Sequence, residues 1–448
     1  MMQSSGNLPL RSNAVRLGAV GIALVILTAL APWLHYRFGG YALWATVVAM
    51  AAAAIWAATS TGEIGPRQAL WIILAVAAAM RAEMLLTEPY LSSDHFRYIW
   101  DGRVQAHGIN PYRHLPSAAE LVGLRDAGIY PNINRADYAP TIYPPAAQML
   151  FFAITRLGET VMVMKLGLLA FEALCIGCLI AVLQRLGLPT RRISAYAWHP
   201  MPIWEIAGNA HVDAAMLGIM LLSLLLYLDR RTLLAAAFAA IATLVKPTAV
   251  LALPVFWKPW DMRMPLVVIA VVALFYAPYL GVGWKVLGFA PGYIAEEGYK
   301  AGGGFWYPDL LQFFVGEIAG IGRVYLALAT AAVGATALWA GFRRDRSPVG
   351  SVRAFAILMT LFLVVLTPHY SWYYLPAVPF LVVYPRAATL WVLTVGSLQI
   401  HDVVPNDVLP AYSYRQFVFH SVVLAAVLWD FRAAPFAVAS MRLGVRQT

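Results

Sequence analysis

Apolar runs long enough to cross a bilayer recur from one end of this 448-residue chain to the other. The first three lie at about 17–35, 42–58 and 67–87. A helix needs about 20 apolar residues to cross the ~30 Å hydrocarbon core of a membrane. Hydrophobic residues make up 61% of the sequence and charged residues 12%, about half the fraction usual in a soluble domain. The pattern predicts an all-α, polytopic membrane protein.

Further apolar segments follow these three, and several are too short for a full perpendicular crossing. Such segments are tolerated at membrane depth where their backbone is buried in protein or lines a cavity. We expect roughly 11–14 transmembrane or half-depth helices in all, with an interfacial or re-entrant helix at 144–157. The further segments lie near 160–183, 194–207, 213–228, 232–245, 248–257, 264–280, 323–341, 353–367, 373–384, 387–400 and 416–431.

Arginine-bearing loops set the expected orientation in the membrane. Examples are QRLGLPTRR at 184–192, DRR at 229–231 and GFRRDR at 341–346. The positive-inside rule assigns such loops to the cytoplasm, and it also accounts for the net charge of +10 without nucleic acid as a partner. We therefore expect a multi-pass protein of the plasma (inner) membrane. The loops expected on the far side, in the periplasm or at the exterior, are 88–143, 208–213, 281–322, 368–373 and 401–415.

The sequence gives no sign of a separate soluble domain or of an internal repeat. We expect a single integral-membrane domain over residues 1–448, with N-terminal spans at 1–87, a large outer loop with juxtamembrane helices at 88–143, and the remaining helices and outer loops at 144–448. The opening apolar run lacks a clear small-residue cleavage site and is interpreted as a membrane helix. The two cysteines, three positions apart in an apolar helix, are interpreted as buried packing residues.

The densest group of ionisable residues, SSDHFRYIWDGR, follows the third span directly. Helical spacing places Asp94, Arg97, Tyr98 and Asp101 on one face. A charged face that emerges from a membrane span is reachable from water and from lipid headgroups. Two interpretations stay open here: interfacial ion pairs that anchor a loop, or a substrate site.

A second group, WHPMPIWEIAGNAHVDAAM, is bounded by strongly apolar sequence and is joined by Lys246 in a later apolar run. Ionisable groups at membrane depth are costly and usually face a cavity or a partner. Glu205 and Asn209 share a helix face, and His211 and Asp213 follow closely. The functional interpretation is a wall of the substrate site. The alternatives are an interhelical hydrogen-bond pair for His211 and Asp213, and a snorkelling lysine.

Aromatic residues gather in the segments EEGYKAGGGFWYPDL and TPHYSWYYLP. They fit an interfacial belt, and they also fit a sugar-binding cleft, because the CH faces of sugars stack on aromatic rings. The segment HDVVPNDVLPAYSYR adds His401, Asp402 and Arg415 as expected rim residues. The candidate substrate-binding residues are His95, Arg97, Tyr98, Arg103, Asn110, Tyr143, Glu205, Asn209, His211, Asp213, Lys246, His369 and Tyr370.

Four motifs together, SSDHFRYIWDGRVQAHGINPYR, TIYPPAAQ, GNAHVDA and LVKPTAVLALP, resemble bacterial membrane glycosyltransferases of the GT-C fold. The resemblance covers about 90–410 and is greatest to polyprenyl-phosphate-mannose-dependent mannosyltransferases and their relatives. It implies that a sugar, mannose or another hexose or pentose, passes from a polyprenyl-phosphate carrier to a glycan or lipid acceptor on the non-cytoplasmic face. By motif position, the essential acidic residue of the family resembles Asp94.

The chemistry of such a transfer fits these residue types. A carboxylate within hydrogen-bond reach takes the proton of the acceptor hydroxyl, so Asp94 is the expected general base and Asp101 a supporting or second acid. The leaving lipid phosphate needs cations, and Arg97, Arg103, Lys246 or His211 could supply them.

Two features depart from the family pattern. Many members have two adjacent acids where this chain has Asp94-His95, which argues against a metal-dependent reaction that uses paired acids. The sequence otherwise leaves open whether a divalent cation, Mg²⁺ or Mn²⁺, takes part. Many members also have one span before the outer loop, and this chain has three.

Two other classes of function remain open at this stage. A transporter or lipid flippase would explain intramembrane Glu205, Asp213 and Lys246 as a coupling site, but it predicts symmetry between the two halves of the chain. A lipid-linked oligosaccharide ligase, or a non-catalytic scaffold, would share the large outer loop. In each case membrane lipids are the immediate surroundings.

Overall fold

The computed structural model describes residues 8–38, 40–60, 64–299, 304–398 and 409–436. Every regular element within these ranges is a helix. Eight of the described helical stretches are long and apolar enough to cross a membrane. The predicted all-α, polytopic architecture is therefore confirmed.

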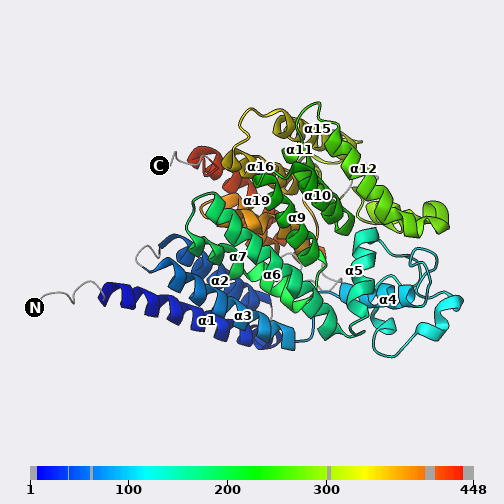
Figure 1. Cartoon of the computed structure of the whole chain (residues 1–448), viewed down its shortest axis with the longest axis horizontal. Coiled ribbons are helices and arrows are strands. Elements are labelled where there is room, and N and C mark those ends of the chain that lie inside the picture. Colours follow the sequence, from blue (N-terminus) through cyan, green and yellow to red (C-terminus); the bar gives the residue numbers. More distant parts are fainter. Residues whose placement is uncertain (1–7, 39, 61–63, 300–303, 399–408, 437–448) are drawn as a thin grey trace, which may run out of the picture.

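The eight long stretches include the three N-terminal helices, which coincide with the first three predicted spans and lie together at one side of the molecule (Figure 1). The eight are α1 (Leu8–Phe38), α2 (Gly40–Ser60), α3 (Pro66–Leu86), α6 (Val161–Arg185), the stretch that joins α12 (Arg263–Tyr276), η6 (Ala277–Leu287) and α13 (Ala290–Glu296), then α15 (Ile321–Phe342), α16 (Pro348–Leu366) and α19 (Leu409–Ala433).

Four shorter apolar segments complete the expected set of spans and half-depth helices. They are α5 (Pro145–Thr155), α9 (Asp213–Leu228), α10 (Thr232–Val245) and the pair η5 (Pro247–Leu251) and α11 (Ala252–Phe256). With 16 and 14 residues, α9 and α10 rise less than the ~30 Å thickness of a bilayer core. Both pack against neighbouring helices, which satisfies the requirement for short segments at membrane depth.

Two predicted apolar segments, 194–207 and 373–384, are not continuous α-helices. Proline has no amide hydrogen to donate and its ring clashes with the preceding turn, so it interrupts helical bonding. The second segment lies largely in the 3₁₀-helix η8 (Ser371–Val382), which contains Pro376 and Pro379. The first consists of α7 (Ser194–Ala197), α8 (Pro200–Pro202) and the π-helix η4 (Ile203–Gly208).

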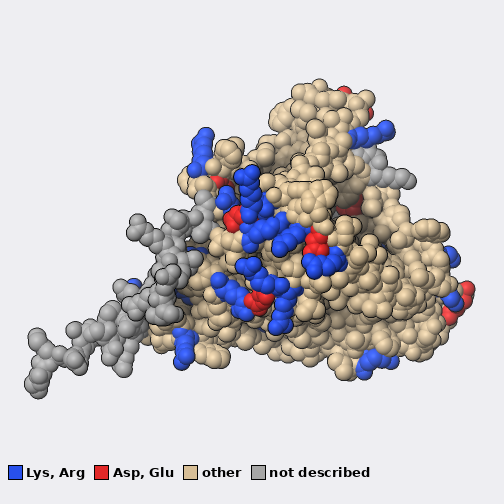
Figure 2. Space-filling model, turned by 45° about the horizontal axis from the view of Figure 1, so that its top comes forward, with Lys and Arg blue, Asp and Glu red and all other residues tan. Residues whose placement is uncertain are grey.

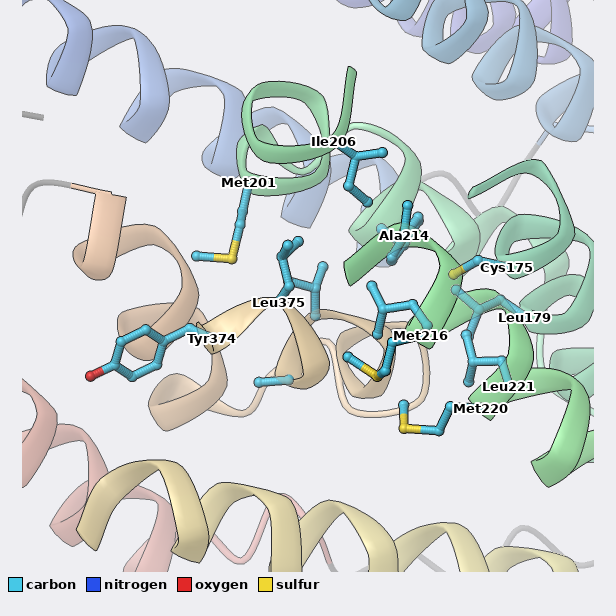
Figure 3. Packing of buried hydrophobic residues seen from close by; sticks show 14 of the residues in the cluster. Cys175, Leu179, Met201, Ile206, Ala214, Met216, Met220, Leu221, Tyr374 and Leu375 are labelled. Carbon is cyan, nitrogen blue, oxygen red and sulfur yellow. The ribbon is translucent and has the colours of Figure 1, made fainter. Parts of the chain in front are cut away.

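The centre of the molecule is an apolar core between α6, α9 and η8 (Figure 3). Cys175 and Leu179 of α6 lie beside Leu221 of α9, and Met216 of α9 lies near Leu375 of η8. Both cysteines are buried and not joined in a disulfide, in agreement with the packing role expected of them. This core fixes the elements whose ends carry the charged residues.

Buried charges also hold the N-terminal helices to the core. Arg81 of α3 makes a bidentate ion pair with Glu172 of α6, with contacts of 2.9 and 2.6 Å, and donates a further hydrogen bond to the carbonyl of Ala197. The Lys165 ammonium donates to the carbonyls of Met84 and Thr87 at the C-terminus of α3, where a helix dipole favours a cation. Both charges are fully matched with partners, so we assign them a structural role.

Helix α4 (Asp94–Ala106) and its following loop lie at the opposite end of the molecule from the start of α1 and the end of α19 (Figure 1). Lysine and arginine side chains gather on one face in Figure 2. The predicted cytoplasmic loops contribute contacts such as Arg185 to Asp229 and Arg346 to the carbonyl of Trp257.

Candidate active site

The predicted outer loops converge on one cavity of about 730 Å³, a volume typical of ligand sites. Its walls come from the start of α4, the 134–145 segment, the start of α9, the end of α10, the η6–α13 region and the turn before η8. Nine predicted site residues line it: Asp94, Arg97, Tyr98, Tyr143, His211, Asp213, Lys246, His369 and Tyr370.

Asp94 is the first residue of α4, and its backbone N–H donates to the hydroxyl of Ser92 at 3.2 Å. Its carboxylate accepts two hydrogen bonds, from Asn134 Nδ2 at 2.8 Å and from Tyr143 Oη at 3.3 Å. Both donors are neutral. A carboxylate held in this way keeps lone pairs for a further donor, because each oxygen accepts more than one hydrogen bond.

Lys246 enters the cavity because the following Pro247 ends α10. A residue before proline is pushed out of the helical region, and Lys246 is extended, with φ −147° and ψ 128°. Its Nζ lies 2.6 Å from both carboxylate oxygens of Asp213 and 4.5 Å from the centre of the Tyr373 ring. Lys246 is therefore a cation that lines the cavity and pairs with Asp213. These contacts do not fit the alternative interpretation of a snorkelling lysine.

Arg97 is held by groups on either side of it. Its Nε donates to Asp101 Oδ1 at 2.9 Å and its Nη1 to the carbonyl of Ala139 at 3.1 Å. The other oxygen of Asp101 accepts from Gln148 Nε2 at 2.9 Å. Asp101 is buried and does not line the cavity. Its contacts position Arg97, and we do not carry the idea of a second acid forward.

His369 lies in the turn between α16 and η8. Its Nδ1 lies 2.6 Å from Glu297 Oε2 and its Nε2 lies 2.9 Å from the carbonyl of Gly304. Burial disfavours the charged imidazolium, but the hydrogen bond and negative charge of Glu297 outweigh it and raise the pKa of His369. Nearby, Tyr370 stacks on Trp372 with ring centres 4.7 Å apart. The aromatic faces here suit the CH faces of a sugar.

Other predicted binding residues hold loops and do not line the cavity. Arg103 pairs with Asp126 and Glu159 at 2.6 and 2.7 Å. Asn110 donates to the carbonyl of Tyr279 at 3.0 Å. The side-chain oxygen of Asn209 accepts from the backbone N–H groups of Tyr90 and Leu91. For these residues the loop-anchoring interpretation fits better than the binding one.

Glu205, another member of the second group, lies next to the cavity-lining His211 and does not itself line the cavity. Glu205 is fully buried and accepts a hydrogen bond from Ser371 Oγ. Its other oxygen lies 3.2 Å from Nδ1 of His211. His95, next to Asp94, is buried behind the cavity wall with no hydrogen-bond partner for either ring nitrogen. Burial, followed by the nearby His211, lowers the pKa of His95 to about 4, so the ring is neutral at physiological pH.

Strained backbone also marks the cavity. Arg135, Ala210 and Thr367 have φ values of 54°, 57° and 46°, although none of them is glycine. Such conformations cost about 1–3 kcal/mol each and cluster at functional sites. Arg135 lines the cavity, and the other two are adjacent in sequence to residues that do.

Sequence reasoning missed several residues that shape the site. Asn134 and Gln148 bond the two acids of α4, and Glu297 bonds His369. Asn134 lies in NINRADYAP, within the predicted outer loop 88–143, and Gln148 lies in TIYPPAAQ, one of the four motifs of the family resemblance. Only their polar side chains beside turn-forming residues could have singled them out. The expected rim residues His401 and Asp402 lie outside the described residues, and Arg415 does not line the cavity.

The described residues include no group of three or more His, Cys, Asp or Glu side chains close enough to hold a metal ion. The fold and the site define a class: a helical membrane protein in which the predicted outer loops line a charged and aromatic cavity.

A family model described as alpha-(1->6)-mannopyranosyltransferase, N-terminal domain, matches residues 6–261. The match covers more than half of the chain, and the chain belongs to this family.

Two curated relatives are also similar. Alpha-(1->6)-mannopyranosyltransferase A of Mycobacterium tuberculosis is 23% identical over an alignment of 326 residues, and the match covers 65% of this chain and 62% of that protein. The protein of the same name from Corynebacterium glutamicum is 25% identical over an alignment of 191 residues, and the match covers 40% of this chain and 37% of that protein. The chain thus spans less than two thirds of either relative. No solved structure matches.

Proposed function

We propose that this protein is a membrane mannosyltransferase that takes mannose from a polyprenyl-phosphate carrier and passes it to a hydroxyl of a glycan or lipid acceptor. The relatives are mannosyltransferases by name. The polyprenyl-phosphate carrier is what the resemblance to GT-C enzymes implies. The observation that carries the proposal is one cavity in which the carboxylate of Asp94 and the cations of Lys246 and Arg97 are brought together.

In this mechanism Asp94 is the general base. Its carboxylate accepts the proton of the acceptor hydroxyl as that oxygen attacks the anomeric carbon of the mannose. The bond from this carbon to the phosphate breaks, and the lipid phosphate leaves with the electron pair. Attack from the face opposite the phosphate inverts the anomeric configuration. Asn134 and Tyr143 orient the base, and a well-placed base contributes about 10²–10⁴-fold to rate.

The cations and the aromatic wall serve the donor. Lys246 and Arg97 stabilise the phosphate as it leaves, because hydrogen bonds between charged groups are stronger than neutral ones. The rings of Tyr370 and Trp372 hold the sugar. The η6–α13 region forms one wall of the cavity. It belongs to the long apolar stretch Arg263–Glu296, in which only 6% of the 18 most hydrophobic consecutive residues are buried inside the protein. This exposed apolar surface suits entry of an isoprenoid chain from the bilayer. We assign the cavity to the non-cytoplasmic side of the plasma (inner) membrane.

The test is transfer by the purified protein from polyprenyl-phosphate-mannose to a short mannoside, with released lipid phosphate measured by mass spectrometry. Asp94→Asn should lower the rate about 10³-fold. Asp137→Asn is the matched control, because Asp137 is an exposed acid of the same loop that does not line the cavity. Undiminished transfer by Asp94→Asn would remove the base assignment. Uptake of a sugar into vesicles without release of lipid phosphate, or transfer of a whole glycan, would favour the transporter or the ligase.

A further inference from the structure

The charges that line the cavity are already paired. Arg97, Lys246, Arg135 and His369 each contact a carboxylate, whereas the carboxylate of Asp94 has only neutral partners among the described residues. An anionic phosphate that enters this cavity therefore meets balanced ion pairs and one further negative charge. When the bond from the phosphate to the sugar breaks, the phosphate takes the electron pair and becomes more basic. An additional proton or cation is needed to stabilise it.

His211 is the lining residue with a ring nitrogen left for that purpose. The residue is 1% exposed, yet it borders the cavity, and its Nε2 has no hydrogen-bond partner among the described residues. The edge of the ring packs against Trp372, with ring centres 4.3 Å apart. A buried polar atom without a partner destabilises a fold, and such an atom in a native structure calls for an explanation. A ligand in the cavity supplies one.

The other side of His211 faces Glu205. Its Nδ1 lies 3.2 Å from Oε2 of Glu205, an ion-pair distance at which the two described atoms do not form a hydrogen bond, and the second oxygen of Glu205 accepts from Ser371. Glu205 lies in the π-helix η4, and Ala210 with φ 57° directly precedes His211. Single-turn π segments and left-handed non-glycine residues are both frequent at functional sites. The local backbone is thus distorted in the way that places these two side chains together.

We propose that His211 is a second catalytic residue, which donates the proton on Nε2 to the departing phosphate oxygen, and that Glu205, anchored by Ser371, is the residue that positions it. This inference rests on the proposed sugar transfer from a lipid phosphate. Because Glu205 lies on the Nδ1 side of the ring, we assign the proton transfer to Nε2.

The proton balance of the step is complete. The acceptor hydroxyl gives its proton to Asp94, and the imidazolium of His211 gives one to the phosphate as the bond to the anomeric carbon breaks. The products are the glycoside, the hydrogen phosphate monoester of the lipid, protonated Asp94 and neutral His211. The second pKa of a phosphate monoester is about 6, so the departing phosphate accepts a proton near neutral pH. Exchange of protons with water in the empty cavity restores both residues.

The decisive measurement is the pH dependence of kcat in the wild-type protein and in His211→Gln and Glu205→Gln. The wild type should give a bell, with an acid limb from Asp94 and a basic limb from His211. His211→Gln should lose the basic limb and about 10²-fold in kcat, with KM for the donor changed less than about 3-fold. Glu205→Gln should keep the basic limb and lower kcat less than His211→Gln does, because the donor remains but is no longer positioned by the carboxylate.

Other titratable groups lie near His211. Asp94, Asp213 and Lys246 line the same cavity, and His95 interacts electrostatically with His211. His95→Gln should keep the basic limb. His420→Gln is the control for loss of a buried histidine, since His420 also has an unpartnered Nε2 but does not line the cavity.

The outcomes separate the two proposals. A basic limb that persists in His211→Gln, or a kcat that Glu205→Gln leaves unchanged, overturns the role of the pair while sugar transfer stands. A wild-type protein that releases no lipid phosphate overturns both.

Discussion

Two groups of buried or half-buried charges in this protein lie on the same helix bundle and differ in one respect. Around Arg81, Glu172 and Lys165, every charged side chain contacts a partner between α3 and α6. Around the cavity, the Asp94 carboxylate accepts only from neutral donors and Nε2 of His211 has no hydrogen-bond partner in the part of the chain that the structure describes. Charge at membrane depth therefore does not identify a site by itself. What distinguishes the cavity is hydrogen-bonding capacity that the protein leaves unused.

The largest expected effect is on stability, and it tests the group of Arg81, Glu172 and Lys165, in which every charged side chain has a partner. Arg81→Met leaves Glu172 buried without its partner, and breaking such a pair costs about 3–5 kcal/mol. We expect a large fall in the unfolding temperature of the detergent-purified protein, followed by intrinsic fluorescence. Arg81→Met/Glu172→Leu should recover most of it, because an apolar pair avoids the uncompensated charge. If Arg81→Met were as stable as the wild type but unable to transfer sugar, the group of Arg81, Glu172 and Lys165 would have to belong to the active site.

The next effect tests the charged residues that line the cavity. Lys246→Met removes a cation from the cavity and leaves Asp213 without it, so we expect transfer to fall about 10²-fold through weakened stabilisation of the phosphate. The cost in stability should be smaller than for Arg81→Met, because Lys246 borders the cavity and Asp213 gains access to water. Initial rates at saturating donor, together with a melting curve, separate the two. Equal losses of stability in both variants would contradict the distinction between the groups.

The smallest effect concerns the rim. Glu297 raises the pKa of His369, so the pair contributes stability that is fully present below the ordinary imidazole pKa of about 6.5 and is lost as pH rises through the raised value. Glu297→Gln should lower the unfolding temperature by about 1–2 °C at pH 6 and by less at pH 9. Melting curves at the two pH values measure it. A larger loss at pH 9 than at pH 6 would reverse the sign and refute the assignment.

Much of the architecture could be predicted from the sequence because hydrocarbon imposes a simple requirement on length and polarity. The three N-terminal spans appear where apolar length predicted them, and the all-α class is confirmed. Pro376 and Pro379 lie in the segment 373–384, which its apolar character predicted as a membrane helix and which these prolines turn into a 3₁₀-helix. Helix α4 was expected from the spacing of Asp94, Arg97 and Asp101, and its ion pair follows that spacing.

The candidate site was predicted less completely. Residues separated by long stretches of chain, such as Lys246 and Asp213 or His369 and Glu297, pair through the fold, and no local pattern links them. Asp101 and Arg103 have the same local character as Asp94, yet they lie outside the cavity and are bonded to neighbours. Charge and position in a motif identify candidates, but the rotation of each side chain depends on helices from elsewhere in the sequence.

By itself, the sequence determined that this is a helical membrane protein, where its first spans lie and which two segments concentrate ionisable residues, because each of these depends on composition over a short window. The tertiary structure alone decided which of those charges are matched with partners and which keep an unused donor or acceptor facing a cavity. The physical reason is that a charge is satisfied by whatever group lies within about 3 Å of it, and in a bundle that group comes from a distant part of the chain.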